Sequence, residues 1–278
     1  MRKILSGRRG SSQPFEFQVD VTSAAPLGTG ANTFKLPLPS GSPSGGNPLN
    51  FLVDWGDGSS LQVNAANHGS AQHTYSSGGV KTIKIYGAVR GWSFGSSSSG
   101  NNDAVKMYKI LNWGGWRSTE NRQFDGCNQL LEITASDYPV IEVGSSWFRM
   151  FANCSALKTI SNINSWKTGA CTNMYAMFYN CVGLNSGGSG GGAGGTGDLF
   201  LWDVSKVADM RFMFMNCSSM NWRMFTMGST TTSADNIFNN CRLFNNGSSA
   251  SISAWNVTGC TSLLNWFRDA LAFNQNIN

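Results

Sequence analysis

The sequence predicts a β-rich α+β protein in which a small β-sandwich precedes a solenoid of strand–helix repeats. The first half contains short apolar segments separated by turns rich in Gly, Ser and Asp, a pattern typical of sandwiches. The second half repeats a Phe followed three residues later by a small residue. Successive copies of that Phe are 27, 27, 36, 24 and 29 residues apart. A nearly constant period of this size indicates repeats that stack on one another.

The N-terminal strands are predicted from alternating and β-branched segments bounded by turn residues. Asp57-Gly58 is a hairpin-type turn signal between two of them. We expect these strands to form a sandwich over residues 15–104 and the repeats to occupy residues 105–278. The expected strand-forming segments are FEFQVDV (15–21), TFKLPL (33–38), FLVDWGDGSS (51–60) and HTYSSGGVKTIKIYG (73–87).

A short helix is predicted in each repeat because the apolar residues recur at three- and four-residue spacing. In residues 165–181 these residues are Met174, Met177, Phe178 and Cys181. No repeat can bury such a stripe alone, so stacking must supply the core. The extended pieces between the helices, predicted to be strands, include LLEIT (130–134) and ALKTI (156–160).

The repeated Phe and the small residue after it are predicted to form the core of the stack. A ligand-binding face is the alternative for the stripe of Met and aromatic residues, but its constant phase along the repeats favours packing. The predicted core residues are Phe124, Cys127, Phe151, Cys154, Phe178, Cys181, Phe214, Cys217, Phe238, Cys241 and Phe267.

All seven cysteines are predicted to be buried free thiols. Five follow the repeated Phe by three residues, and Cys171 and Cys260 share a second repeat position. Ala270 and Val207 occupy the equivalent positions elsewhere, so both sites require a small apolar group, and buried Cys behaves in this way. A disulfide ladder is the alternative. A zinc site lacks support because there is no Cys-x-x-Cys and no nearby His.

The net charge of +5 is concentrated in an N-terminal arm, residues 1–14. Arg2, Lys3, Arg8 and Arg9 give this arm a charge of +4, and we expect them to dock on an acidic partner. A solvated terminus is the alternative. The arm lacks the apolar stretch of about 7–15 residues that a signal peptide needs. No run approaches the roughly 18 apolar residues of a membrane helix.

Two segments interrupt the regularity of the repeats. The Gly-rich insertion SGGSGGGAGGTG (186–197) accounts for the longest interval and is expected to be a surface loop. The pattern stops at ALAFNQNIN (270–278) without a polar capping unit. An uncapped end exposes apolar groups and strand edges, which favours a homo-oligomer or a partner contact there.

No catalytic residue, metal site or cofactor is predicted. The two histidines are His68 and His73, and we expect His73 to pair with the DWGDG turn as a structural residue. Asp54 and Asp57 fall short of the 6–8 oxygen ligands that calcium takes. The chain contains no metalloprotease helix, phosphate-binding loop or dinucleotide fingerprint. Only 13% of its residues are charged, which predicts a neutral polar surface of Ser, Asn, Thr and Gly.

Two stretches resemble known families. VDWGDGS, HTYSSGG and KTIKIYG look like a PKD-type (polycystic-kidney-disease-type) immunoglobulin-like domain. WDVSKVADM, MFMNC and AFNQNIN resemble the BspA-like leucine-rich-repeat surface proteins and the related mycoplasma lipoprotein-associated repeat, with residues 106–115 joining the two parts. The resemblance implies an immunoglobulin-like sandwich followed by leucine-rich-repeat-like units. The predicted residues of the sandwich turn are Asp54, Trp55, Asp57, His73 and Tyr75.

The resemblance implies a display or adhesion module rather than an enzyme. We expect a virion structural protein of a tailed phage, as a capsid decoration, head-fibre or tail-appendage subunit. The chain starts at Met1 without a recognisable export signal and carries a basic arm suited to docking. The expected partners are capsid or tail proteins and a host-surface receptor or glycan, with no membrane insertion. A bacterial cell-surface adhesin is the alternative. A glycan-active enzyme is disfavoured, because no pair of acids repeats in a cleft-like context.

Overall fold

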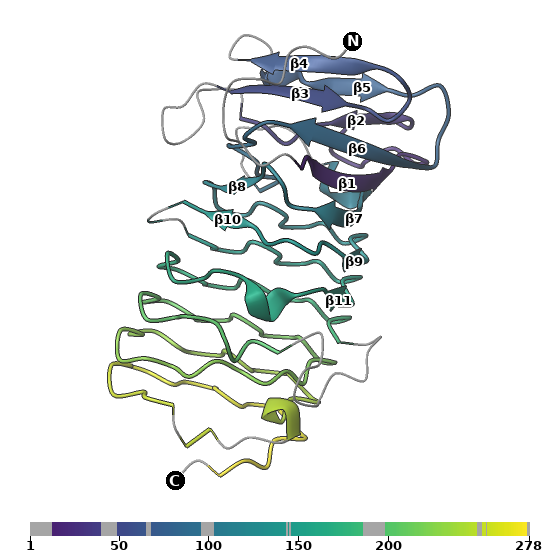
Figure 1. Cartoon of the computed structure of the whole chain (residues 1–278). Coiled ribbons are helices and arrows are strands. Elements are labelled where there is room, and N and C mark those ends of the chain that lie inside the picture. Colours follow the sequence, from purple (N-terminus) through teal and green to yellow (C-terminus); the bar gives the residue numbers. More distant parts are fainter. Residues whose placement is uncertain are drawn as a thin grey trace.

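The computed structural model shows an elongated molecule in which an N-terminal sheet lies at one end and the repeats are stacked beneath it (Figure 1). The structure describes residues 13–39, 49–64, 68–95, 103–142, 144, 146–185, 198–248, 252–253 and 255–276. The C-terminal residues lie at the end of the stack furthest from the sheet (Figure 1).

The regular elements are short strands and 3-10 turns. The N-terminal region holds β1 (Phe15–Asp20), β2 (Thr33–Lys35), β3 (Asn50–Asp54), β4 (Ser60–Asn64), η1 (His68–Ser70), β5 (Gln72–Thr74) and β6 (Val80–Tyr86). The remainder holds η2 (Asp103–Lys106), β7 (Met107–Asn112), β8 (Arg117–Ser118), β9 (Glu132–Ile133), β10 (Val140–Ile141), β11 (Thr159–Ile160), η3 (Ile163–Ser165) and η4 (Asn246–Ser248).

One seven-stranded sheet, in the order β11-β9-β7-β1-β6-β3-β4, runs from the N-terminal region into the repeats. Strand β1 lies in its middle and pairs antiparallel with both β6 and β7, while β9 and β11 continue the sheet in parallel. Alternate residues of β1, namely Phe15, Phe17 and Val19, are fully buried, as its alternating sequence requires. The sheet therefore crosses the position between residues 104 and 105 at which the sequence predicts a domain boundary.

The prediction of an N-terminal immunoglobulin-like sandwich is wrong. Besides the large sheet, the described part of this region has only the pair β2–β5 as a second layer. The strand expected over residues 33–38 ends at Lys35, because Pro37 and Pro39 lack the N–H that a paired strand needs. Part of the apolar face of the sheet packs against tryptophans that flank the start of the repeats. Phe15 meets the rings of Trp92 and Trp113 at centroid distances of 5.2 and 6.2 Å.

The prediction of a strand–helix solenoid is also wrong, because the described residues contain no α-helix. Each repeat has residues with positive φ two positions before and two positions after its Phe. Around Phe178 these are Ala176 (φ 51°) and Asn180 (φ 62°). A left-handed residue recurring at this spacing cannot belong to a right-handed helix. The apolar spacing arises from consecutive turns, each closed by a bond from an amide to the carbonyl three residues earlier, as from Cys181 N to Phe178 O at 3.1 Å.

Backbone amides that are not used within these turns donate to carbonyls of the next repeat and so join the two repeats. Ala176, Phe178 and Asn180 donate to three carbonyls of the following repeat at 2.8–2.9 Å, and the other repeats follow the same pattern. The repeated Phe residues consequently form a column with centroid separations of 5.4–5.8 Å and interplanar angles of 3–9°. The stack is thus made of turns and short parallel bridges around an aromatic column.

Candidate functional site

The predicted turn residues of the N-terminal region lie together. His73 Nε2 lies 2.7 Å from Asp57 Oδ2, and its ring stacks on Trp55 at 5.3 Å and meets the edge of Tyr75 at 4.6 Å. The Tyr75 hydroxyl donates to the Trp55 carbonyl at 3.0 Å. Burial, with the nearby Asp57 and Asp54 carboxylates, raises the pKa of Tyr75 above its usual range. The cluster fixes the β3–β4 hairpin against β5.

This cluster has the residue types of a hydrolytic triad but not its geometry. Ser59 Oγ donates to Asp57 Oδ1 at 2.5 Å and lies 3.3 Å from His73 Nε2. A triad needs the hydroxyl and the carboxylate on opposite ring nitrogens, whereas here both contact Nε2. Within the described ranges, no group of three or more His, Cys, Asp or Glu residues could hold a metal ion. The arrangement therefore supports a structural role.

Replacing Asp57 by Asn is expected to remove a pH-dependent part of the stability. Hydrogen bonds from Ser59 and His73 hold the pKa of Asp57 far below its usual range. With the pKa lowered on folding, this stabilisation is present above the unfolded pKa of about 3.9 and is lost as the pH falls below it. Because Asp57 is exposed, the loss near pH 7 should be below about 1 kcal/mol. Urea unfolding of both proteins between about pH 7 and 2.5 should show the difference shrinking with acid. A constant difference would contradict the assignment.

The cysteines of the repeats contribute hydrogen-bond donors to the core as well as small side chains. All seven cysteines are free, six are buried, and Cys260 is half-buried. In four repeats the thiol donates to the carbonyl of the preceding repeat's Phe at 2.8–3.2 Å. Burial raises the pKa of these thiols. The sequence indicates their size but not this donor role. The donating residues are Cys154, Cys181, Cys217 and Cys241.

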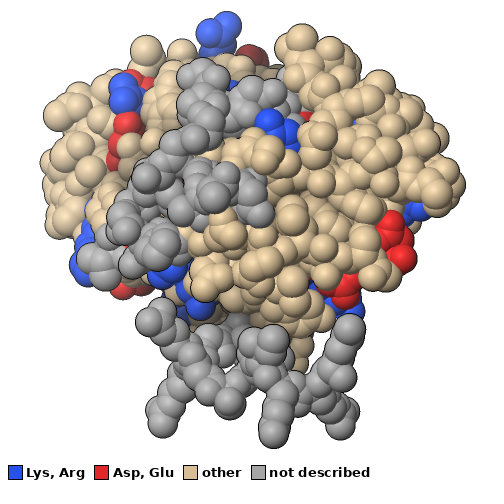
Figure 2. All heavy atoms as spheres, turned by 90° about the horizontal axis from the view of Figure 1, so that it is seen from above, with Lys and Arg blue, Asp and Glu red and all other residues tan. Residues whose placement is uncertain are grey.

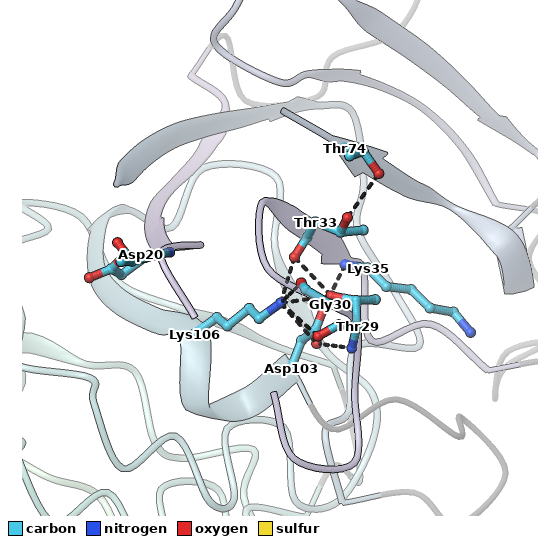
Figure 3. A network of polar contacts seen from close by, with 9 residues as sticks. Asp20, Thr29, Gly30, Thr33, Lys35, Thr74, Asp103 and Lys106 are labelled. Atoms are coloured by element: carbon cyan, nitrogen blue, oxygen red, sulfur yellow. Dashed lines mark hydrogen bonds and ion pairs between the residues drawn. The ribbon is translucent and has the colours of Figure 1, made fainter. Parts of the chain in front are cut away.

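A buried ion pair that the sequence does not predict lies where the N-terminal region meets the repeats (Figure 3). The side chains of Lys106 and Asp103 are 2% and 0% exposed, and their charged atoms are 3.7 Å apart. The ammonium donates to the carbonyls of Gly30 and Thr33 at 2.8 and 2.7 Å and to the Thr29 hydroxyl at 2.8 Å. Burial lowers the pKa of Lys106, and the neighbouring Asp103 opposes that shift.

The carboxylate of Asp103 completes this clamp. It accepts hydrogen bonds from the amide and hydroxyl of Thr29 and from the amide of Lys35, all at 2.8 Å (Figure 3). Both charges are therefore satisfied by the loop that leads into β2. The hydrogen-bonding partners described for both charged groups all belong to the protein itself. The pair is therefore a structural clamp and not a binding site.

The outward side of the turns carries a group of aromatic and arginine side chains that we call the turn face. The Tyr175 ring stacks on Phe148 at 5.0 Å and meets Phe212 edge-on at 5.4 Å. The Arg211 guanidinium lies 5.3 Å from the centre of the Tyr175 ring. The Arg149 guanidinium lies 5.8 Å from the centre of the Tyr179 ring. These side chains are half-buried. The turn face consists of Arg122, Phe148, Arg149, Tyr175, Tyr179, Arg211 and Phe212.

Carboxylates hold the guanidiniums of the turn face in place. Asp125 bridges Arg122 at 2.9 Å and Arg149 at 2.8 Å. Asp209 binds Arg211 through two bonds of 3.0 and 2.7 Å. Two-point contacts fix the plane of a guanidinium, and Arg149 and Arg211 each make one to a carboxylate.

An asparagine ladder runs beside the turn face. Asn180 donates to Asn153 at 3.2 Å, Asn216 donates to Asn180 at 2.8 Å, and Asn240 donates to Asn216 at 3.0 Å. At the first step Asn153 donates to Asp125 at 3.0 Å. Each of these asparagines has φ between 59° and 66°. Asn tolerates that conformation better than most residues with a Cβ, which explains its recurrence before the small residue.

Asn180→Val is expected to destabilise the protein more than Asn180→Gly. Valine must adopt positive φ at a cost of about 1–2 kcal/mol, and it also breaks two ladder bonds worth about 1 kcal/mol each. Glycine loses the same bonds but carries no such backbone strain. Urea unfolding of the two variants measures the difference. Equal losses would show that backbone strain does not govern this position.

Two groups of predicted residues fall outside the described part of the chain. They are the basic arm, with Arg2, Lys3, Arg8 and Arg9, and the Gly-rich insertion 186–197. Seen from the sheet end, the surface carries scattered charged side chains separated by wide uncharged areas (Figure 2). None of the helices described is long and apolar enough to span a bilayer.

The stacked turns define a repeat protein. The model of one family, described as Mycoplasma protein of unknown function, DUF285, matches residues 119–221 and 228–278. The match covers more than half of the chain, which therefore belongs to this family, one associated with BspA-like surface repeat proteins. No curated protein and no solved structure matches the chain.

Proposed function

We propose that the chain is a non-enzymatic adhesion subunit of a tailed-phage virion, placed as a capsid decoration, head fibre or tail appendage. The observation that carries the adhesion role is the turn face with its asparagine ladder. Together they present polar and aromatic groups at repeated positions over successive repeats. Family membership supports surface display. The basic residues Arg2, Lys3, Arg8 and Arg9 would dock the subunit on capsid or tail proteins.

A bacterial cell-surface adhesin of the BspA-like class is the second candidate. It is favoured by the association of the family with surface repeat proteins. In this case the same turn face would meet its ligand from the surface of a cell. The proposal of a homo-oligomer through the last repeat applies to both candidates, because Leu264 and Leu271 there are 61% and 69% exposed.

Mass spectrometry of purified particles tests the virion proposal. We expect the chain in intact virions at a constant stoichiometry, and its absence from particles with presence in the cell-envelope fraction would favour the adhesin. A chain lacking residues 1–12 should fold normally but lose association with particles. Light scattering of the full chain at micromolar concentration tests the oligomer, and a monomer would remove that part of the proposal.

A further inference from the structure

We infer that the turn face binds a neutral, hydroxyl-rich polysaccharide along the axis of the stack, with Tyr175 and Tyr179 at its centre. The inference rests on the proposed adhesion function and names its ligand class. Four properties carry it: unused hydrogen-bonding groups, rigidity, balanced charge and periodicity.

The face and its ladder hold polar groups whose hydrogen-bonding capacity is not used up. No hydrogen bond joins the hydroxyl of Tyr175 or Tyr179 to another described residue. An asparagine amide has two N–H donors and two acceptor lone pairs, while each interior ladder residue uses one of each on its neighbours. The half-buried ladder therefore keeps a donor and an acceptor at every step. A sugar hydroxyl, itself both donor and acceptor, complements such a pair.

The binding groups are already fixed before a ligand arrives. Asp125 and Asp209 hold the three guanidiniums, and the Tyr175 ring is held between Phe148 and Phe212. Ordering flexible side chains costs about 0.5–1.5 kcal/mol each on binding. Removing that cost favours the binding of a weakly interacting ligand such as a neutral sugar. The tyrosine rings add amphipathic surface for its C–H groups.

The charges of the face are balanced. Asp125 and Asp209 bind the three guanidiniums, and Asp235 of the next repeat acts electrostatically on Arg211, so the face offers no excess positive charge to a polyanion. Binding of nucleic acid or an acidic polysaccharide relies on such an excess. The charged residues are Arg122, Arg149 and Arg211 with Asp125, Asp209 and Asp235.

The ladder asparagines recur at the spacing of one repeat, which is about 4.8 Å where repeats are joined by strand-type bonds. A ligand that itself repeats can engage several steps of the ladder, so that weak contacts add through effective concentration. A folded protein partner has no such requirement. It would instead need protruding anchors that become fully desolvated, whereas the rings here are already half-buried against each other.

Affinity gel electrophoresis of the full chain in dextran, mannan and galactan tests the inference, with alginate as the anionic probe. We expect at least one neutral polysaccharide to retard the chain. Tyr175→Ala should weaken this binding at least about tenfold, and Tyr179→Phe, which removes only a hydroxyl, about threefold or more. Tyr138→Ala is the matched control, because Tyr138 is 41% exposed, contacts Lys167 and lies outside the turn face. It should leave binding unchanged, and circular dichroism should show that all three variants are folded at the temperature of the binding assay.

Three results would overturn the inference: no retardation by any neutral polysaccharide, retardation by alginate alone, or equal binding by wild type and both turn-face variants. Capture of a partner protein that survives enzymatic removal of its sugars, with no polysaccharide binding, would also overturn it. A different result would refute the proposed function without refuting the ligand class. If particles and cell envelopes lack the chain while the purified chain binds neutral polysaccharide, the adhesion subunit is refuted and the ligand class stands.

Discussion

Replacing Lys106 by methionine is expected to lower the free energy of unfolding by about 3–5 kcal/mol, the loss typical of breaking a buried ion pair. The change leaves Asp103, which is fully buried, without its counter-ion. It also removes the donor that satisfies the carbonyls of Gly30 and Thr33. Equilibrium unfolding in urea, followed by tryptophan fluorescence and circular dichroism, measures the loss. We expect the variant to fold with a less stable N-terminal region.

Two further variants test whether the loss of stability comes from the buried ion pair. Lys106→Met combined with Asp103→Leu should recover part of the loss, because it removes the unpaired charge. Lys109→Met is the matched control, since Lys109 pairs with Glu132 on the surface, and its loss should stay below about 1 kcal/mol. If Lys106→Met and Lys109→Met lower the free energy of unfolding equally, the clamp contributes no more to stability than a surface ion pair.

This clamp illustrates what could not be predicted from the sequence. Asp103 and Lys106 are three residues apart, a spacing that ordinarily indicates an exposed pair on one turn. Their hydrogen-bond partners, Thr29, Gly30 and Thr33, lie more than 70 residues away in the chain. Which distant carbonyls gather around a lysine depends on how the sheet and the repeats close on each other. Local pattern does not contain that information.

The wrong prediction of helices has a different origin, because the sequence contains a pattern that a helix does not explain. Apolar residues at three- and four-residue spacing are shared by a helix and by consecutive turns. The residue before the small core position, however, is always one that tolerates positive φ. A helix has no reason to repeat such residues at its interior, so this column favoured turns. Its members are Gly126, Asn153, Asn180, Asn216, Asn240 and Asp269.

The candidate site was only partly predictable for the same reason. The contact of His73 with the DWGDG turn follows from turn chemistry and joins residues only 16 positions apart in the chain. Nothing in the local sequence pattern marks Tyr175, Tyr179 and Arg211 as members of one face. Their alignment into one face becomes visible only when each repeat is folded as turns and stacked in register. The repeat period was therefore predictable, but the chemistry of its outer side was not.

Phe178→Ala is expected to cost about 3–5 kcal/mol, because it leaves a cavity in the middle of the aromatic column. The Phe178 ring is fully buried and stacks between Phe151 at 5.7 Å and Phe214 at 5.4 Å. Phe267→Ala is the matched control at the last repeat. Phe267 is only half-buried, with Phe238 stacked at 5.6 Å and Phe273 at 4.0 Å, and no repeat follows it, so its truncation should lower the free energy of unfolding by about 1–2 kcal/mol.

The two substitutions should also differ in how the protein unfolds. In a stack of repeats each unit is stabilised by its neighbours, so stability is a sum of nearest-neighbour terms. Loss of the central ring weakens the coupling between the repeats on either side, and unfolding should lose its single cooperative transition. Loss of the last ring should only fray the end and keep one transition. Hydrogen exchange of the repeat amides can resolve these cases. A single sharp transition in Phe178→Ala, with the same loss as Phe267→Ala, would show that the Phe column does not carry the cohesion of the stack.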